Sequence, residues 1–314
     1  MARTDTLGNF LTDVADAIRT KKGTNETILA SNFDTEIENL PSGADLSEYF
    51  ATTWSSNTSG SQNRGVIKII KKAPPTITIA NNVTDLSTAL ANWTQEYAPK
   101  IICGNNVTNM QSMYGGMYNI KELDITGLNT SNVTSFYQMF SQFGRNVTPA
   151  TSLDFSNFDT SKVQNFGYMF SYAKVDADFS TFSFDSATSV ANMFQYADIE
   201  NQTINMPNFK THNLTSLNYF LANCNAKIVN LPNLEIGNIT TTNFAFQTAN
   251  TLQHLDIRKL EFDNVTTYNN MFSGVPNNCE IIVKDDTQKT WITSRFSNLT
   301  NVKTVAEYEA EQSE

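Results

Sequence analysis

The chain has 314 residues, of which 40% are hydrophobic and only 17% charged, with a formal net charge of -10. Ordinary domains are roughly 25% charged, so uncharged residues, chiefly Asn and Thr, supply the missing polarity. An acidic chain lacks the Lys and Arg excess that neutralises phosphates, which excludes nucleic acid and anionic membranes as expected partners.

No stretch reaches the roughly 18 consecutive apolar residues of a membrane-spanning helix, and residues 1–20 lack the apolar core and cleavage site of a signal peptide. We therefore expect no membrane insertion, and synthesis in the cytoplasm without general secretion. The cysteine spacing fits neither a disulfide framework nor a C-x-x-C metal site, so no metal or cofactor is expected. The cysteines are interpreted as buried thiols: Cys103, Cys224 and Cys279.

Residues 1–42 predict a small module of two helices, the first ending near Gly23 and the second capped by Ser31 and ending before Pro41. Such a module is too small to fold well alone, so its apolar stripes are expected to dock on another protein. The docking residues are Phe10, Leu11, Val14 and Ile18 in the first helix and Phe33 and Ile37 in the second.

The string Asp13-Val14-Ala15-Asp16-Ala17-Ile18-Arg19, with Gly23-Thr24 and Phe33 after it, resembles an N-terminal module of phage proteins. These are structural and tail-associated proteins of phages that infect low-GC Gram-positive bacteria. The resemblance implies that residues 1–42 attach the chain to other virion proteins. Residues 43–100 follow as a predicted linker and strand-bearing N-terminal cap, with a Gly/Ser/Asn-rich stretch over 55–65.

Residues 101–283 contain about seven copies of one unit. An aromatic residue that usually follows Met recurs at spacings of 26, 30, 24, 26, 26 and 26 residues, and two further apolar series keep the same register. Because one unit cannot bury its own apolar face, the copies must stack into a solenoid. The aromatic series is predicted to form a core spine rather than a ligand groove. Its members are Tyr114, Phe140, Phe170, Phe194, Phe220, Phe246 and Phe272.

Each unit predicts a short strand, a polar turn and a helical turn. Leu123-Asp124-Ile125 has the alternation of a strand, and Val133, Phe136, Met139 and Phe140 have the spacing of a short helix. The fold class expected is therefore an α+β repeat.

At these residues the chain resembles the BspA-like leucine-rich repeats, also called bacterial surface protein 26-residue repeats. The matching residues of one copy are Leu123-Asp124-Ile125, Thr130-Ser131-Asn132-Val133-Thr134 and Met139-Phe140. The resemblance implies a leucine-rich-repeat solenoid that binds surfaces or proteins. Copies around Phe220 and Phe246 lack the Met, which predicts local repacking. Residues 284–314 are expected to form a C-terminal cap and tail, with one helix over 287–296.

Two sets of residues are candidate binding sites. Side-chain alternation places one Asp of each strand outward, and stacked carboxylates repel unless a cation or cationic ligand relieves them. The alternative is that each Asp accepts hydrogen bonds from a turn. This acidic column comprises Glu122, Asp124, Asp154, Asp176 and Asp178.

The second set is the insertion of the 30-residue copy, residues 143–150, because solenoid insertions form loops that often bind ligands. Arg145 and Asn146 are its candidates. Deleting this insertion is expected to spare thermal stability and to reduce adsorption to host cells.

Sequence motifs for hydrolases, zinc proteases and nucleotide binding are absent, so no catalytic residue is assigned and the chain is expected not to be an enzyme. We expect a phage tail or baseplate protein, exposed on the virion, that displays its solenoid to a host-surface glycan or protein. Alternatives are a capsid or neck decoration protein, a bacterial surface adhesin and a wall-glycan depolymerase. Assembly into a homo-oligomer stays open.

Overall fold

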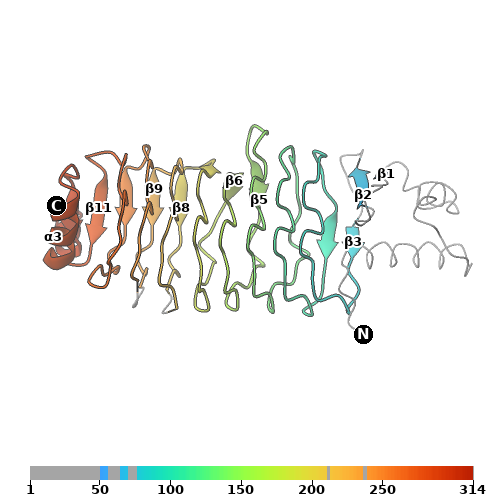
Figure 1. Ribbon diagram of the computed structural model, residues 1–314, viewed down its shortest axis with the longest axis horizontal. Helices are drawn as coiled ribbons and strands as arrows, with labels where there is room; N and C mark the ends of the chain where they lie inside the picture. Colours follow the sequence, from blue (N-terminus) through green and yellow to red (C-terminus); the bar gives the residue numbers. More distant parts are fainter. Residues whose placement is uncertain (1–49, 56–63, 70–75, 211–212, 236–238, 314) are drawn as a thin grey trace, which may run out of the picture.

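The computed structural model describes residues 50–55, 64–69, 76–210, 213–235 and 239–313. Within these residues the chain winds into a parallel β-solenoid of about nine turns, here called coils, which lie side by side along one axis (Figure 1). The solenoid confirms the repeat architecture that the spacing predicted. The helical module over residues 1–42, with Phe10, Leu11, Val14, Ile18, Phe33 and Ile37, lies outside the described residues.

The strands are short, and successive coils contribute them to parallel ladders. An antiparallel hairpin precedes the coils and consists of β1 (Phe50–Ser55) and β2 (Arg64–Ile69). The parallel sheets are β3 (Thr76–Thr78) with β4 (Lys100–Ile102); β5 (Thr151–Leu153), β6 (Lys174–Ala177) and β7 (Asp198–Ile199); and β8 (Thr203–Asn205), β9 (Ile228–Asn230), β10 (His254–Asp256), β11 (Glu280–Val283) and β12 (Val302–Thr304).

Parallel stacking begins before residue 101, since β3 already pairs with β4 within the segment predicted as the N-terminal cap. The strands also begin one to three residues earlier than the apolar-polar-apolar triplets. Alternation itself is as expected, because Leu153 and Phe155 are buried and Asp154 between them is exposed.

The predicted helical turn is wrong. Residues 136–143 form consecutive β-turns, in which the Met139 N–H donates to the Phe136 carbonyl and Gln138 has a φ of 56°. Alternate N–H groups point to the next coil instead of their own. The Gln138 N–H, for example, donates to the Gly167 carbonyl of the next coil. Such a turn ribbon buries Val133, Phe136, Met139 and Phe140 as a helix would, which is why the spacing could not distinguish the two.

The solenoid interior holds an aromatic column. Tyr114, Phe140, Phe170 and Phe194 stack with centroid separations of 5.4, 5.6 and 5.4 Å and interplanar angles of 19°, 4° and 10°. Phe246 and Phe272 stack again at 5.2 Å. Each added face-to-face ring removes a large apolar area from water, and the column therefore holds adjacent coils together.

Phe220 does not belong to this column, which corrects the predicted spine by one residue. Phe194 donates its N–H to the Phe220 carbonyl, whereas Tyr114, Phe140, Phe170 and Phe246 each donate to the residue just before their column neighbour. The column position is thus Leu221, and Phe220 takes the place that Met occupies elsewhere. Its ring lies at 80° to that of Phe194 and contacts Phe209. The loss of Met is therefore accompanied by the local repacking that the sequence predicted.

Asn and Thr side chains join the coils at their corners. The Thr134 hydroxyl donates to the Thr108 carbonyl of the preceding coil, and Thr266 donates to Thr240 in the same way. The Asn132 amide donates to Asn105. The Asn132 side chain thereby satisfies a turn carbonyl, and the Thr hydroxyls add a second hydrogen bond to carbonyls that already accept a backbone N–H. This explains the high Asn and Thr content and the repeated Asn-x-Thr triplets.

Tyr114 is the one column member with a polar group. Its hydroxyl is fully buried and makes no hydrogen bond within the described residues, and burial raises its pKa. An unsatisfied buried hydroxyl costs about 1–3 kcal/mol. We expect Tyr114→Phe to raise the free energy of unfolding by about 1 kcal/mol, measured by denaturant titration. Tyr168→Phe, which alters a half-buried ring, is the control and is expected to change nothing.

The C-terminal end is closed by α3 (Asp286–Arg295), β12 and α4 (Val305–Glu311), the first of which confirms the predicted cap helix. Asp285 caps α3, and Ile292 is buried against the last coils. Trp291 stacks on Phe262 at 4.6 Å. These two helices are the ones found in the described part of the chain, and neither is long and apolar enough to cross a membrane.

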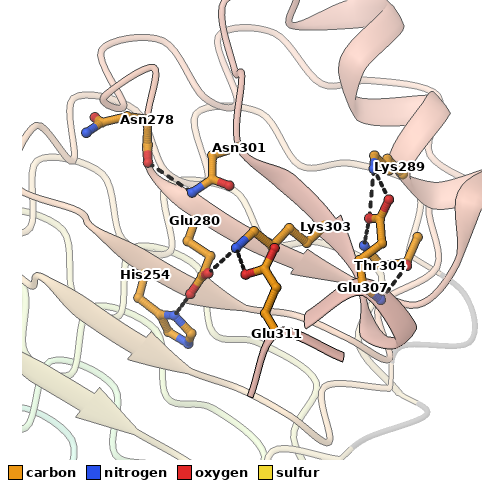
Figure 2. Close-up of polar contacts among 9 residues, drawn as sticks. All are labelled: His254, Asn278, Glu280, Lys289, Asn301, Lys303, Thr304, Glu307 and Glu311. Atoms are coloured by element: carbon orange, nitrogen blue, oxygen red, sulfur yellow. Dashed lines mark hydrogen bonds and ion pairs between the residues drawn. The ribbon is translucent and has the colours of Figure 1, made fainter. Parts of the chain in front are cut away.

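Ion pairs fasten the cap to the strand edge (Figure 2). Lys303 of β12 bridges Glu280 of β11, at 3.0 Å, and Glu311 of α4. The Nδ1 atom of His254 lies 2.7 Å from the other Glu280 oxygen. Glu307 closes a capping box with Thr304 and also meets Lys289. The edge of the sheet is thus covered rather than open to pairing.

This cluster predicts an acid-sensitive cap. Burial pushes the pKa of Glu280 up, but the hydrogen bonds from Lys303 and His254 outweigh it, so the pKa lies below the ordinary 4.5. A carboxylate with a lowered folded pKa stabilises the fold above its unfolded pKa, and that contribution is lost as pH falls through the folded value. Glu280→Gln should therefore melt lower than wild type at pH 7, and the two melting curves should converge below pH 4.5. An equal difference in melting temperature at pH 7 and below pH 4.5 would contradict this prediction.

Candidate binding surface

The insertion of the 30-residue copy is a loop fixed to the solenoid. Figure 1 shows the segment before β5 rising above the neighbouring coils. Gly144 adopts a φ of 61° and donates its N–H to the Met117 carbonyl, and Phe143 and Val147 on either side of it are buried. Deleting residues 143–150 would thus remove core contacts, and the structure leads us to expect a lower melting temperature instead of the neutrality expected from the sequence.

Arg145 and Asn146 occupy different roles at the loop tip. The Asn146 side chain donates to Asn119 at 2.9 Å, and its backbone N–H donates to Tyr118 at 2.8 Å, so Asn146 anchors the loop. The exposed Arg145 guanidinium lies 5.5 Å from the centroid of the Tyr172 ring. A cation over an aromatic face is attracted by the ring quadrupole. Both residues are exposed, but of the two only Asn146 is held by side-chain and backbone hydrogen bonds to the preceding coil among the described residues, whereas Arg145 contacts the Tyr172 ring.

Tyr172 belongs to a stack that the sequence did not predict. Its ring packs on Tyr196 of the next coil at 4.5 Å and 12°, and the two residues are 38% and 44% exposed. Arg145, Tyr172 and Tyr196 form a continuous surface cluster, here called the Arg-Tyr stack. The sequence did contain a signal, since each Tyr follows its column Phe by two residues in consecutive copies.

The backbone under these rings is strained. Two positions of each turn ribbon, four residues apart, have positive φ, which Gly and Asn adopt easily and bulky residues do not. Gly116, Asn223 and Gly274 occupy such positions, as expected. Aromatic residues occupy others at a cost of order 1–3 kcal/mol each. These are Tyr168, Tyr172, Tyr196, Tyr219 and Phe244, with φ between 54° and 59°.

The outer surface formed by the positive-φ positions of the turn ribbons is here called the turn face. A second stack on it joins Tyr219 and Phe244 at 4.6 Å and 13°, both half-buried. Backbone ladders place Asn223 next to Tyr196 and Asn192 next to Tyr219. Within the described residues, neither of these Asn side chains makes a hydrogen bond. The two aromatic stacks therefore each end beside a carboxamide, of which that of Asn223 is half-buried and that of Asn192 is buried.

The Asp side chains of the acidic column accept hydrogen bonds from the turns that follow the strands. Asp124, Asp154 and Asp178 each accept a hydrogen bond from the backbone N–H two residues on, at 2.8–2.9 Å. The side-chain and backbone hydrogen bonds of Ser156 hold the pKa of Asp154 below its usual range. These are Asx turns, which the alternative interpretation anticipated. Asp256, the middle residue of its own apolar-polar-apolar triplet, is by contrast only 5% exposed and binds Arg258.

The remaining column members lie on the strand face. Asp176 is half-buried in β6 opposite Ser152, and Glu122 forms an isolated bridge with Tyr97. Glu122 and Asp124 line an open hollow of about 470 Å³ together with Lys100 and Lys121. Its charges are paired, because Lys100 lies 2.8 Å from Asp124 and Lys121 lies 2.8 Å from Glu96.

The three cysteines are free and buried, as predicted. Burial raises the pKa of Cys224 and of Cys279 to about 12, which keeps these thiols protonated and unreactive. In the described ranges, no three His, Cys, Asp or Glu side chains lie together as metal ligands would.

The coils, their hydrogen-bonded corners and their capped end define a repeat protein of the solenoid class. The chain belongs to the family described as "Mycoplasma protein of unknown function, DUF285", whose model matches residues 84–206 and 198–308. The match agrees with the resemblance to BspA-like repeats. No curated protein and no solved structure matches the chain.

Proposed function

We propose that the chain is a phage virion protein of the tail or baseplate that uses its solenoid to bind the host surface. Residues 1–42, by their resemblance, would attach it to the virion. The capped solenoid offers an extended surface, and repeat solenoids use such extended surfaces for binding.

The Arg-Tyr stack carries the binding part of this proposal. Tyr and Arg are the residues that dominate binding energy at interfaces, and here they are exposed on the insertion loop and the two coils beside it. Tyr172 and Tyr196 take positive-φ turn positions at which Gly or Asn would cost less, so backbone stability alone does not favour tyrosine there. Several copies on one particle would multiply weak single contacts by avidity.

Localisation tests the virion part. Antibodies raised against the full chain are applied to phage particles from the strain that carries the gene, and the particles are imaged by electron microscopy. Labelling at the tail tip or baseplate supports the proposal. Labelling on the head or neck would replace it with a decoration role, and labelling of uninfected cells alone would indicate an adhesin.

Adsorption tests the binding part. Excess purified full-length chain is expected to block adsorption of the phage, and Arg145→Ala should need at least tenfold more protein for the same block. The matched control is Arg295→Ala, because Arg295 also lies over aromatic rings, 4.5 Å from the Trp291 centroid, but at the cap. Blocking by wild type and by Arg145→Ala at equal concentrations would contradict a role for the stack. Release of reducing sugar from host walls would instead point to a depolymerase.

A further inference from the structure

We infer that α4 is a lid, held closed by ion pairs, that opens over the outer face of β10, β11 and β12 while the solenoid stays folded. The lid lies at the C-terminal cap, so its opening is independent of the proposed function. Its motion is confined to one helix and is distinct from unfolding of the whole chain.

An isoleucine of β11 is covered on the outer face of the sheet. Ile281 and Val283 belong to the solenoid core, so Ile282 between them points away from it. Ile282 is nevertheless fully buried, whereas Ile228 on the outer face of β9 is 39% exposed. α4 packs against β11 and β12, and Lys303, the β12 partner of Ile282, forms an ion pair with α4. The helix therefore covers Ile282.

The helix that covers this residue has little packing of its own. None of the seven residues of α4 is buried. Isolated helices shorter than about 12–15 residues are marginal in water, so α4 is not stable without its contacts to the sheet. Its position depends on polar contacts at its surface rather than on a buried apolar stripe. Elements of this kind open locally at a small fraction of the cost of global unfolding.

The first turn of α4 is its fixed end. Thr304 is the N-cap residue and forms a capping box with Glu307. The Glu307 carboxylate also accepts hydrogen bonds from Lys289 of α3, at 2.6 and 2.7 Å. The capping box and this charge-assisted contact hold the first turn in place. The lid therefore turns about Thr304.

The far end of α4 is held by exposed charges. Glu309 lies 3.7 Å from Arg258, and Glu311 pairs with Lys303 (Figure 2). The two carboxylate side chains are 64% and 53% exposed, and exposed ion pairs stabilise only weakly. The Tyr308 ring adds a cation–π contact, with its centroid 5.8 Å from the Arg258 guanidinium. Loss of these few contacts frees the moving end.

Acid and salt act on these ion pairs in the same direction. The hydrogen bond from Lys289 holds the pKa of Glu307 below its ordinary 4.5, so the pair is present at neutral pH and is lost as pH falls through the lowered value. At neutral pH, 1 M salt reduces the screening length to about 3 Å and weakens exposed pairs. The groups that face one another are Glu307, Tyr308, Glu309 and Glu311 on α4, and Lys289, His254, Asp256, Arg258, Glu280 and Lys303 on the elements that it covers.

Hydrogen exchange of the full chain tests the motion. Exchange is followed by mass spectrometry at pH 7 in 50 mM and in 1 M NaCl, and at pH 4, with rates corrected for the intrinsic effect of pH. We expect amides of residues 306–312 to lose protection at least tenfold in 1 M NaCl and at pH 4, while β9, β10 and β11 keep theirs. Protection of α4 that ignores both conditions, or that is lost only together with the strands, overturns the inference.

A charge variant tests the contacts. The double variant Glu309→Gln with Glu311→Gln should exchange at residues 306–312 at least tenfold faster than wild type in 50 mM NaCl, and 1 M NaCl should add little. The matched control is Glu261→Gln, which removes an equally exposed carboxylate that pairs with Lys284 outside α4. It should leave α4 protected as in wild type. Equal protection of α4 in the double variant and in wild type overturns the inference.

Cysteine labelling tests what the lid covers. Ile282→Cys is treated with a maleimide in 50 mM and in 1 M NaCl, with wild type as the background because its three cysteines are buried. We expect labelling at least tenfold faster in 1 M NaCl. Ile228→Cys, on the uncovered part of the same face, should label rapidly and equally at both salt concentrations. An Ile282→Cys thiol that stays unlabelled where α4 has lost its protection shows that α4 is no lid over this face.

Discussion

Replacing Phe170 with alanine is expected to lower the free energy of unfolding by about 3–5 kcal/mol. The ring is fully buried and stacks on Phe140 and Phe194 at 5.6 and 5.4 Å, and it also meets Phe155 and Phe179 edge-on. Its removal leaves a cavity that several rigid rings border, and these rings cannot collapse into it without leaving their own stacks. The change is measured as the shift of the denaturant midpoint at a constant slope.

The loss should also be local. Coils contact mainly their neighbours, so weakening one column position should loosen the adjacent coils first. Hydrogen exchange is expected to increase at the amides of residues 136–143 and 190–197 more than at the cap. Tyr172→Asn, an exposed change two residues away, is the control and should shift the midpoint far less. Equal shifts for the two variants would show that the column does not hold the coils together.

The sequence was sufficient to predict the solenoid because its signal is chemical and repeated. A buried aromatic, a β-branched or aliphatic residue before it and an alternating strand triplet recur in register, and only stacked coils bury all three. The same logic failed at Phe220, where a shift of one residue put Leu221 in the column. Two neighbouring apolar residues are interchangeable in a spacing argument, and the backbone register alone decides between them.

The turn ribbon was mistaken for a helix for a related reason. Apolar spacing reports which side chains face inward, and consecutive β-turns and a helical turn give the same answer over eight residues. What distinguishes them is the direction of the N–H groups, which here point to the next coil. The sequence did not indicate the positive φ values of residues such as Tyr168 and Phe244, because stacking between coils imposes these conformations.

The candidate binding surface was predicted only in part. The 30-residue spacing identified the loop and Arg145, because an insertion between packed coils must leave the core. Tyr172 and Tyr196 were missed, since an aromatic residue near a core position is more often buried than exposed. The acidic column was one candidate ligand site, and the structure supports the alternative that the sequence left open, because Asp124, Asp154 and Asp178 each form an Asx turn.

Replacing Gly144 with alanine is expected to destabilise the protein by about 2–3 kcal/mol and to impair binding through Arg145. Gly144 has a φ of 61°, and a Cβ atom there would lie 2.5 Å from the Lys174 carbonyl oxygen, which is backbone and cannot swing aside. Relief requires the loop to lift from the coil that carries β6. Arg145 would then lose its position over Tyr172, so adsorption blocking should fall together with the melting temperature.

Gly104→Ala is the matched control for this change. Its Cβ would meet only the side-chain oxygen of Asn81, at 3.3 Å, and its φ lies outside the left-handed range. We expect a stability change of less than about 1 kcal/mol and undiminished blocking. If Gly144→Ala keeps full blocking despite its lower melting temperature, the loop position and the binding surface are independent, and the link from the insertion to Arg145 and Tyr172 is contradicted. Loss of blocking in Gly144→Ala but not in Gly104→Ala would support that link. The two substitutions add the same methyl group, and they differ in the backbone geometry at which they add it.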